Sequence, residues 1–358
     1  MVNITARIAG IEYEPLLCRD LRIYPIENLP EALSCESAFL LDSGTKKRFA
    51  ISHWVSPKRT RSYPYARVYD TLSFQGKRVT IIPVIKDEGL QGDRDYIQYD
   101  TLTLMGLLGV HVILSYYKDA QKSSRHPNKI TDQSFDYDHI MNELERLEKY
   151  QSDALHWNMQ QVENVSVIAQ KAIRAYQEIS ERFGVKLHSL DQAWKRIEIL
   201  KKSRDIFISH SRALAKEAQE RESHIIQPKE NINAQKATLT IENFLGGIYY
   251  FTCDEVYTQQ DQIFLIEAKH SRNQLIPSAE DIKDGLLRMI LLTNLKEVTI
   301  GQRVFSSISV LRLTSERAFA IENLTSSQRE TLHLLKKEAE NNHFYVIINE
   351  TNLNRFEL

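Results

Sequence analysis

Two acids and a lysine near the C-terminal end of the chain have the residue types that phosphodiester hydrolysis requires. They are Asp254, Glu267 and Lys269, within the segment YYFTCDEVYTQQDQIFLIEAK. Carboxylates supply the hard oxygen ligands that Mg²⁺ prefers, and a bound Mg²⁺ activates water and stabilises charge at the phosphorus under attack. A nearby lysine can orient that water and neutralise the developing charge. The three residues therefore suit metal-dependent cleavage of a phosphodiester bond.

The pattern around these residues predicts a β-hairpin that brings them together. Asp254 lies near the end of one apolar run, Gln259-Gln260-Asp261 marks a turn, and a second apolar run leads to Glu267 and Lys269. Because side chains alternate in direction along a strand, Glu267 and Lys269 share one face. A hairpin with this turn places Asp254 close to Glu267.

The segment resembles the signature of the PD-(D/E)XK nuclease superfamily, and especially of its type II restriction endonucleases. The likeness consists of Asp254, twelve intervening residues and the triplet Glu267-Ala268-Lys269, which follows the apolar run IFLI. It implies that Asp254 and Glu267 hold Mg²⁺ and that Lys269 acts on the attacking water. It also implies a core in which the elements follow the order helix, strand, strand, helix, strand.

Two other interpretations of the segment stay open. Cys253 stands where the signature has proline, and Glu255 and Asp261 are further candidates for the first acid, although the spacing favours Asp254. The segment is also compatible with an ordinary half-buried hairpin in which the glutamate and lysine of the triplet form an ion pair.

The flanking segments are expected to supply the remaining elements of the nuclease core. Thr240 is predicted to cap a short helix that contains Glu242. An acid on such a helix joins the metal ligands in many nucleases of this type, which makes Glu242 a further metal candidate. Its alternative role is to stabilise the first helical turn through the helix dipole. Ser278 is predicted to begin an amphipathic helix, and Val304 to Leu313 to form a strand.

A basic, aromatic-rich stretch in the N-terminal region is the candidate DNA-contacting segment. No acid occurs between Asp42 and Asp70. Lysine and arginine bind phosphates, and arginine can also read guanine edges. The candidate contacts are Lys58, Arg59, Arg61 and Arg67. The alternative is a positive loop that covers acidic surface of the protein itself. On the predicted amphipathic helix, Lys283 and Arg288 either approach phosphates or lie on the solvated face.

A second segment has the outline of the C-terminal motif. It runs from Arg67 to Lys86, with Asp70 after an aromatic run and Val84 where a second glutamate is expected. One interpretation is a second nuclease-like lobe with an incomplete acid set. In that lobe nearby acids could substitute, namely Asp87, Glu88, Asp93 or Asp95. The other interpretation is a common β-α-β unit.

The chain divides into three regions by pattern. Residues 1 to about 130 alternate apolar runs with turns and predict an α/β lobe, and residues 236 to 358 hold the nuclease-like core. Residues 135 to about 225 have a helical pattern, in which a capping box at Ser189 begins a second long helix. We therefore expect a long helical hairpin between the two lobes.

Composition excludes several classes of protein. The 358 residues carry a formal net charge of −1, so any nucleic-acid surface must be a local patch. Three dispersed cysteines indicate neither a disulfide framework nor a zinc site. Neither a signal peptide nor a membrane-length apolar run is visible, and glycine motifs for nucleotide binding are also missing. These features predict a cytoplasmic protein without a nucleotide cofactor.

The sequence thus predicts a mixed α/β (α+β) protein with a PD-(D/E)XK-type core. The resemblance implies a Mg²⁺-dependent endonuclease for double-stranded DNA, of the type II restriction class, that cuts at a specific sequence. Because cutting both strands of a symmetric site needs two related active sites, a homodimer is expected. The alternative is a DNA-binding or assembly protein in which the Glu-Ala-Lys hairpin is structural.

Overall fold

The computed structural model describes two compact units, each built around its own sheet. It describes residues 2–44, 47–58, 63–195, 209, 212–213, 216–217, 219–220, 235–244 and 247–355. One unit comprises Leu21–Arg212, and the other combines Met1–Asp20 with Ala213–Leu358. The class is mixed α and β, as predicted. The division differs from the predicted one, because the first twenty residues belong with the C-terminal part of the chain.

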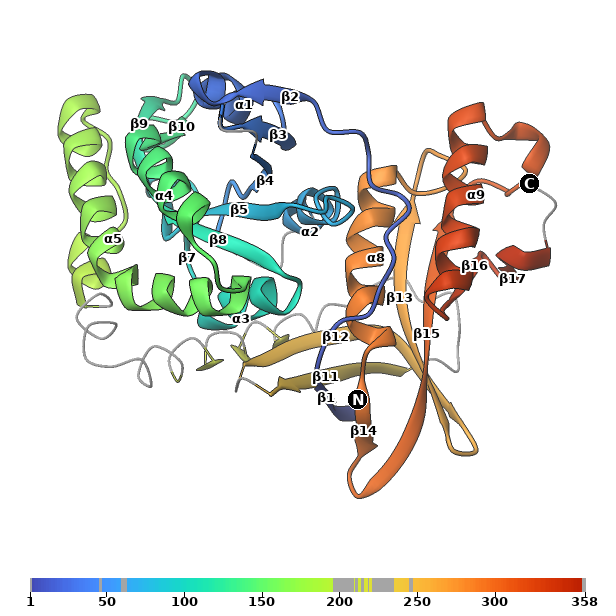
Figure 1. Cartoon of the computed structure of the whole chain (residues 1–358). Coiled ribbons are helices and arrows are strands. Elements are labelled where there is room, and N and C mark those ends of the chain that lie inside the picture. The colour runs from blue at the N-terminus through green and yellow to red at the C-terminus, as the bar shows by residue number, and fades with distance from the viewer. Residues whose placement is uncertain are drawn as a thin grey trace. The chain divides into compact units, whose positions relative to one another are not determined.

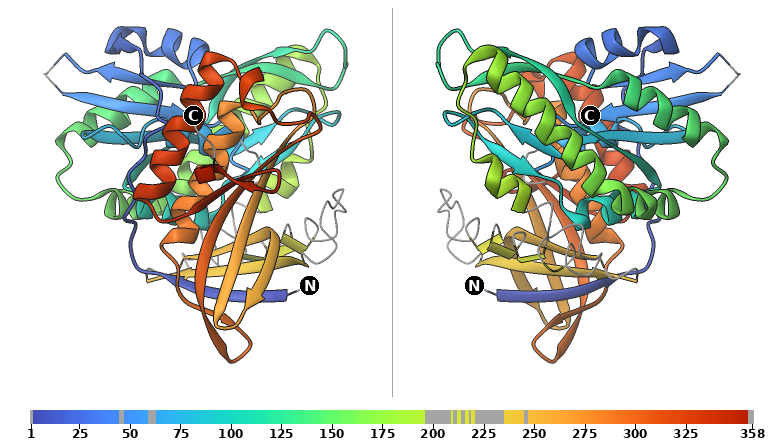
Figure 2. Two further views of the ribbon diagram at one scale, coloured as in Figure 1. Left: turned by 90° about the vertical axis from the view of Figure 1, so that its right-hand side faces the viewer. Right: turned by 90° about the vertical axis from the view of Figure 1, so that its left-hand side faces the viewer.

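The C-terminal unit contains an eight-stranded mixed sheet within its described residues. Its order is β13-β12-β11-β1-β14-β15-β16-β17, and a further pairing of β13 with β15 closes six of these strands into a ring. Figure 2 shows the curl of this sheet. The strands are β1 (Val2–Ile8), β11 (Gln235–Asn243), β12 (Ile248–Gln259), β13 (Gln262–Ser271), β14 (Lys296–Ile300), β15 (Arg303–Ser315), β16 (Tyr345–Ile348) and β17 (Thr351–Asn352).

Two helices connect the parallel strands of this sheet. Helix α8 (Ala279–Thr293) lies between β13 and β15 in the chain, and α9 (Ser326–Asn341) lies between β15 and β16 (Figure 1). The strands pair in parallel, β13 with β15 and β15 with β16. The predicted helix after Ser278 and the predicted strand around Val304–Leu313 are confirmed. The Ser278 side chain accepts a hydrogen bond from the Asp281 backbone, which is the expected N-cap.

The predicted hairpin is confirmed with the predicted turn. β12 and β13 pair antiparallel, with Gln259 opposite Gln262. Gln260 takes up a left-handed φ of 55°, so the chain reverses within two residues. On its other side β12 pairs with β11, and the register shifts between Cys253 and Val256. Such an irregularity re-aims side chains where it occurs, and Asp254 lies within it.

The helix predicted after Thr240 is wrong, because this segment is the end of strand β11. Ala237, Leu239 and Ile241 are buried at 0%, 1% and 0% exposure. Apolar residues at every second position follow the period of a strand and bury one face of it. The Thr240 and Glu242 signals for a helix start were therefore outweighed by this alternation.

The N-terminal unit is built on a five-stranded sheet with the order β2-β3-β4-β5-β8. Strands β4, β5 and β8 pair in parallel, and β3 is antiparallel to β4. The sheet strands are β2 (Ile23–Pro25), β3 (Ala38–Asp42), β4 (Arg48–His53), β5 (Lys77–Pro83) and β8 (Val110–Ser115). Two small hairpins complete the β-structure, formed by β6 (Ile85–Asp87) with β7 (Arg94–Tyr96) and by β9 (Tyr117–Lys122) with β10 (Ile130–Phe135).

Five helices whose bounds lie within the described residues belong to this unit, and residues 190–195 are also helical. The five are α1 (Leu29–Cys35), α2 (Tyr63–Tyr69), α3 (Tyr99–Leu107), α4 (Tyr137–Lys149) and α5 (Ala154–Phe183). α5 packs on the sheet through side chains such as Trp157 and Asn158. Trp157 Nε1 donates to the Val112 carbonyl at 2.7 Å, and the Asn158 amide accepts from the Val112 backbone N–H at 2.7 Å. This unit has strands and helices, but its bounds differ from those of the predicted α/β lobe, residues 1 to about 130, and it also includes α4 and α5.

The predicted second copy of the nuclease motif is wrong. The residues before Asp70 form helix α2, whereas the copy required a strand there. Lys86 lies in the short strand β6 and pairs with Glu88, with 2.6 Å between Lys86 Nζ and Glu88 Oε1. The order β4, α2, β5, α3, β8 with parallel strands is the common β-α-β pattern that was the other interpretation.

The predicted helical hairpin is present only in part. The helical pattern from residue 135 is interrupted between Tyr150 and Asp153, where α4 ends and the Asp153 side chain caps α5. Helix α5 then ends at Gly184, whose φ of 60° favours glycine. The helix predicted from Ser189 lies mostly outside the described residues. In the part that the structure describes, no helix combines the length and apolar character needed to cross a membrane.

Candidate active site

The hairpin brings Asp254 and Glu267 to neighbouring positions, as predicted. Glu255 is opposite Ile266 in the antiparallel register, so the next position along each strand is Asp254 and Glu267. The Ala268 backbone N–H donates to Asp254 Oδ2 at 2.9 Å. This hydrogen bond fixes one oxygen of the first acid beside the strand that carries the second.

Lys269 lies on the Glu267 side of β13 and contacts two carboxylates. Its Nζ is 3.0 Å from Glu267 Oε1 and also donates to Asp284 Oδ2 on α8. The side chains of Lys269, Glu267 and Asp284 are 16%, 9% and 7% exposed. The predicted shared face is confirmed, and the ion pair between Glu267 and Lys269 that the alternative interpretation expected is also present and buried.

The other candidates for the first acid lie elsewhere. Glu255 forms an ion pair with Arg312 of β15. Asp261 lies at the tip of the hairpin, where its Oδ1 is 3.0 Å from Arg303 Nη2. Of the three acids considered, Asp254 is the one that contacts the backbone beside Glu267.

Two residues of α8 join the cluster without having been predicted as partners of these acids. Asp284 holds the Lys269 ammonium. Arg288 follows one helical turn later, and its Cζ lies 4.2 Å from the centre of the Phe251 ring on β12. A sequence signal existed, because Asp284 falls among the buried apolar positions of an amphipathic helix, where an unpaired acid is costly.

Burial and neighbouring charges shift the pKa values of Asp254, Asp284 and Lys269. Burial first, and the neighbouring Glu267 second, raise the pKa of Asp254 from its usual value to about 7, against the lowering effects of the Ala268 N–H and Lys269. Burial also raises the pKa of Asp284, although Lys269 opposes that change. Burial alone would lower the pKa of Lys269, but Glu267 and Asp284 outweigh it and raise that pKa.

The Asp254 and Glu267 carboxylates have the chemistry that a divalent cation requires. Both are hard oxygen donors from adjacent strands, and the Glu267 charge raises the pKa of Asp254. Mg²⁺ is bound in proteins by one or two carboxylates together with waters and substrate phosphate oxygens. In the described parts of the chain, no group of three or more histidine, cysteine, aspartate or glutamate side chains is arranged to hold a metal.

Glu242 is not part of this cluster. It is opposite Ile248 in the β11–β12 register, six positions along β12 from Asp254, and its side chain is exposed. At about 3.3 Å per residue the separation along the strand is roughly 20 Å. The predicted contribution of Glu242 to a metal site depended on the helix that proved to be a strand.

The predicted DNA-contacting residues lie in the N-terminal unit. The Lys58 side chain is 46% exposed, and its Nζ is 3.7 Å from Asp95 Oδ1. Arg67 Nη1 donates to the His53 carbonyl at 2.8 Å. Burial and the Arg67 charge lower the pKa of His53 to about 4, which keeps that ring neutral. Arg59 and Arg61 lie outside the described residues.

Lys283 does not lie on a solvated helix face, which was one of its two predicted positions. Its side chain is 6% exposed, with Nζ 3.5 Å from Glu280 Oε1. Arg288 is partly buried against Phe251. The polar residues of α8 therefore take part in packing as well as solvation.

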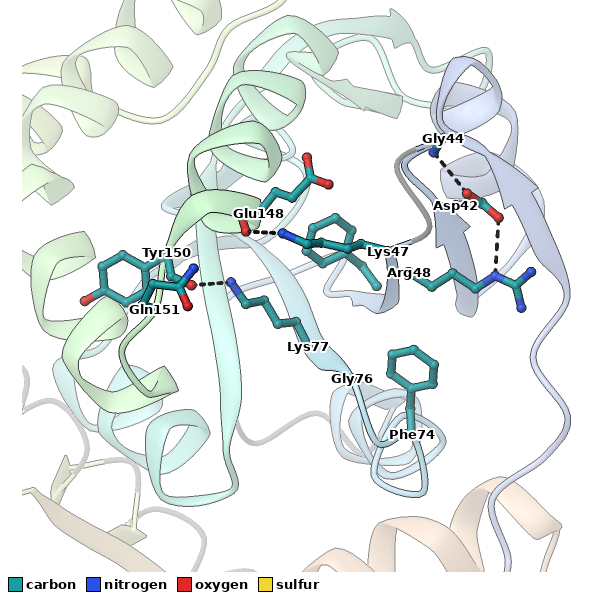
Figure 3. A pocket seen from close by; sticks show the side chains of 11 residues that line it. Asp42, Gly44, Lys47, Arg48, Phe74, Gly76, Lys77, Glu148, Tyr150 and Gln151 are labelled. Carbon is teal, nitrogen blue, oxygen red and sulfur yellow. Dashed lines mark hydrogen bonds and ion pairs between the residues drawn. The ribbon is translucent and has the colours of Figure 1, made fainter.

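A hollow of about 920 Å³ in the N-terminal unit is lined by both signs of charge. Its cations include Lys47 and Lys77, which point toward the end of α4 (Figure 3). Lys77 Nζ donates to the carbonyls of Leu147 and Tyr150, and Lys47 Nζ donates to the Glu148 carbonyl at 3.2 Å. These hydrogen bonds satisfy carbonyls at the C-terminus of α4, so the two lysines have a structural role at this helix end.

Comparison with known proteins assigns no family to the chain. No family model matches the chain, and neither the curated proteins nor the solved structures gave a significant match.

Proposed function

We propose that the chain is a Mg²⁺-dependent endonuclease for double-stranded DNA, of the type II restriction class, with its active centre in the C-terminal unit. The observation that carries the proposal is the cluster on β12 and β13. There Asp254, Glu267 and Lys269 lie together although thirteen positions separate the two acids in sequence. Two carboxylates lie beside a buried lysine in this cluster. These groups suit metal-dependent phosphodiester hydrolysis.

The arrangement of the strands supports the same function. β12 and β13 form the hairpin, α8 follows, and β15 pairs in parallel with β13. This is the strand, strand, helix, strand part of the order that the resemblance to PD-(D/E)XK nucleases implies. The element before the hairpin is the strand β11, and β1 and β14 extend the sheet beyond it.

Each residue has a role that follows from its contacts. Asp254 and Glu267 would hold the cation, which would supply water activation and charge stabilisation when bound. The Lys269 ammonium donates hydrogen bonds toward the attacking water and the phosphate oxygens. The water oxygen would form the new bond to phosphorus as it gives up a proton to solvent, the bond to the leaving oxygen would break, and that oxygen would take up a proton from solvent. The Arg288 charge acts on Asp254 and its guanidinium lies over the Phe251 ring, so we propose that Arg288 would contact the scissile phosphate.

The substrate and assembly follow from the reaction. Cleavage of both strands at a symmetric site needs two active centres related by a two-fold axis, so we propose a homodimer. The N-terminal unit would add sequence-independent contacts through Lys58 and Arg67, whose charges can bind phosphates.

The experiment is incubation of the purified protein with unmodified plasmid DNA in Mg²⁺ and in EDTA. Discrete fragments that require Mg²⁺ are expected. DNA binding without cleavage in any divalent cation would favour the alternative, a DNA-binding or assembly protein with a structural hairpin.

A further inference from the structure

The Lys269 ammonium is shared between two acids that belong to different elements. Glu267 is two residues away on the same strand, with 3.0 Å between Glu267 Oε1 and Lys269 Nζ. Asp284 comes from α8 and accepts a hydrogen bond from the same Nζ. All three side chains are largely buried, so water competes little for these contacts.

Glu267 has two uses that conflict. In the proposed function it binds the divalent cation, yet in this structure it contacts the Lys269 ammonium. An ammonium and a metal ion attract the same carboxylate oxygens, so a lysine held by Glu267 alone would compete directly with the cation. A second acid gives the ammonium another partner.

Helix α8 lies close to the sheet next to Asp284. Gly285 follows it, and a Cβ at Gly285 would lie 3.3 Å from Lys269 Cε and 2.7 Å from Leu311 Cδ1. Helix α8 therefore approaches β13 and β15 closely at this turn, where a larger residue would contact the lysine. Asp284 reaches the ammonium because the helix lies so near the strand.

We propose that Asp284 is a positioning residue that retains the Lys269 ammonium on the α8 side and thereby leaves Glu267 available to a divalent cation. This inference rests on the proposed function. Asp284 acts through Lys269 and is not itself a metal ligand.

The first test measures the contact without metal. Thermal unfolding in EDTA is compared for the wild type, Lys269→Met, Asp284→Asn and the double variant. The two single changes are expected to be non-additive in unfolding free energy, because each removes the partner of the other. Additive effects would overturn the inference, since they would mean that the pair is not coupled.

The second test measures the affinity for Ca²⁺ by calorimetry, with no DNA present. Asp284→Asn is expected to weaken binding on the order of tenfold, as loss of a residue that orients a ligand does. In the Lys269→Met background the same change is expected to alter affinity by less than about threefold, because no ammonium remains to compete for Glu267.

The outcomes are distinct. An equal loss in both backgrounds would mean that Asp284 acts as a ligand or through its charge alone, and would overturn the inference. Asp284→Glu should restore binding in part, and Glu280→Gln, an exposed acid on the same helix, serves as the control. If Asp284→Asn fails to fold, Asp284→Ser replaces it.

Failure of the proposed function has a different signature. A wild type that binds no divalent cation at all would overturn the nuclease proposal, whatever the unfolding experiment shows. A wild type that binds Ca²⁺ with an affinity unaffected by Asp284→Asn would overturn only the positioning role.

Discussion

The Asp254 side chain is held in an environment that disfavours its charge. Burial and the adjacent Glu267 raise its pKa to about 7. In the metal-free protein the acid pair is therefore a source of instability near neutral pH. A site that lowers its own stability in this way is typical of a functional centre.

This environment predicts how stability depends on pH. A carboxyl with a raised folded pKa stabilises the fold while it is protonated, so the contribution is present at about pH 4 and lost as pH rises through about 7. The rise of the Asp254 pKa from 3.8 to about 7 corresponds to at most about 4 kcal/mol. In EDTA, the unfolding free energy of wild type relative to Asp254→Asn should fall between pH 4 and pH 7. A constant difference across that range would contradict the assignment.

Metal binding should have the opposite pH dependence. Asp254 must lose its proton to bind a cation, so affinity for Mg²⁺ or Ca²⁺ should rise about tenfold for each pH unit below 7 and level off above it. Calorimetry between pH 6 and pH 8 measures this. Affinity that does not change with pH would show that Asp254 is not a ligand.

The site residues differ in whether the sequence alone could predict their positions. Asp254, Glu267 and Lys269 were predictable, because the turn and the alternation of one hairpin determine their proximity. The position of Asp284 in α8 indicated that it needs a partner, but the identity of that partner was not predictable, because no local rule states which face of a later helix meets a given strand. The contact depends on the crossing of α8 over β13, which is a tertiary feature.

At the scale of elements, the closeness of α8 to the sheet is the feature that sets the site. Gly285→Ala adds a methyl group 2.7 Å from Leu311 Cδ1 and 3.3 Å from Lys269 Cε. Alanine favours a helix by about 1 kcal/mol over glycine, but overpacking costs about 1–3 kcal/mol. We expect a net loss of stability by chemical denaturation and weaker cleavage. Increased stability with full activity would mean that the lysine has room to move.

The elements also show which sequence signals compete. Thr240 and Glu242 have the spacing of a helix start, while Ala237, Leu239 and Ile241 alternate as in a strand. The segment forms a strand because burial of the Ala237, Leu239 and Ile241 side chains in the sheet stabilises it more than a capped helix start, which contributes about 1 kcal/mol. At the hairpin itself, the turn and both apolar runs agreed, and the prediction was confirmed.

At the scale of the whole chain, the N-terminal segment is a structural part of the C-terminal unit. β1 pairs in parallel with β11, from Val2 opposite Ala237 to Ile8 opposite Asn243. Division of a sequence into consecutive regions cannot reveal such a pairing, since more than two hundred residues separate the partners. The predicted boundary at residue 236 therefore divided one sheet.

Removal of residues 1–20 should consequently destabilise the C-terminal unit. Besides β1, the segment provides three donors to the buried Glu338: the Tyr13 hydroxyl at 2.7 Å and the backbone N–H groups of Leu16 and Leu17 at 2.8 and 3.0 Å. Each such bond to a charged group contributes about 1.5–3 kcal/mol. Limited proteolysis should cut the truncated chain rapidly within β12 and β13. Resistance equal to that of the full chain would contradict the assignment of this strand.

The most direct test of the nuclease proposal is cleavage of plasmid DNA by Glu267→Ala and Lys269→Ala, beside the wild type and the exposed control Glu297→Ala on β14. Cleavage rates in Mg²⁺ are compared with DNA affinity in Ca²⁺. We expect the two site variants to lose at least about a hundredfold in rate while binding DNA, as loss of a transition-state contact does, and the control to cut normally. A Lys269→Ala protein that cuts DNA at the wild-type rate would contradict the proposed active site.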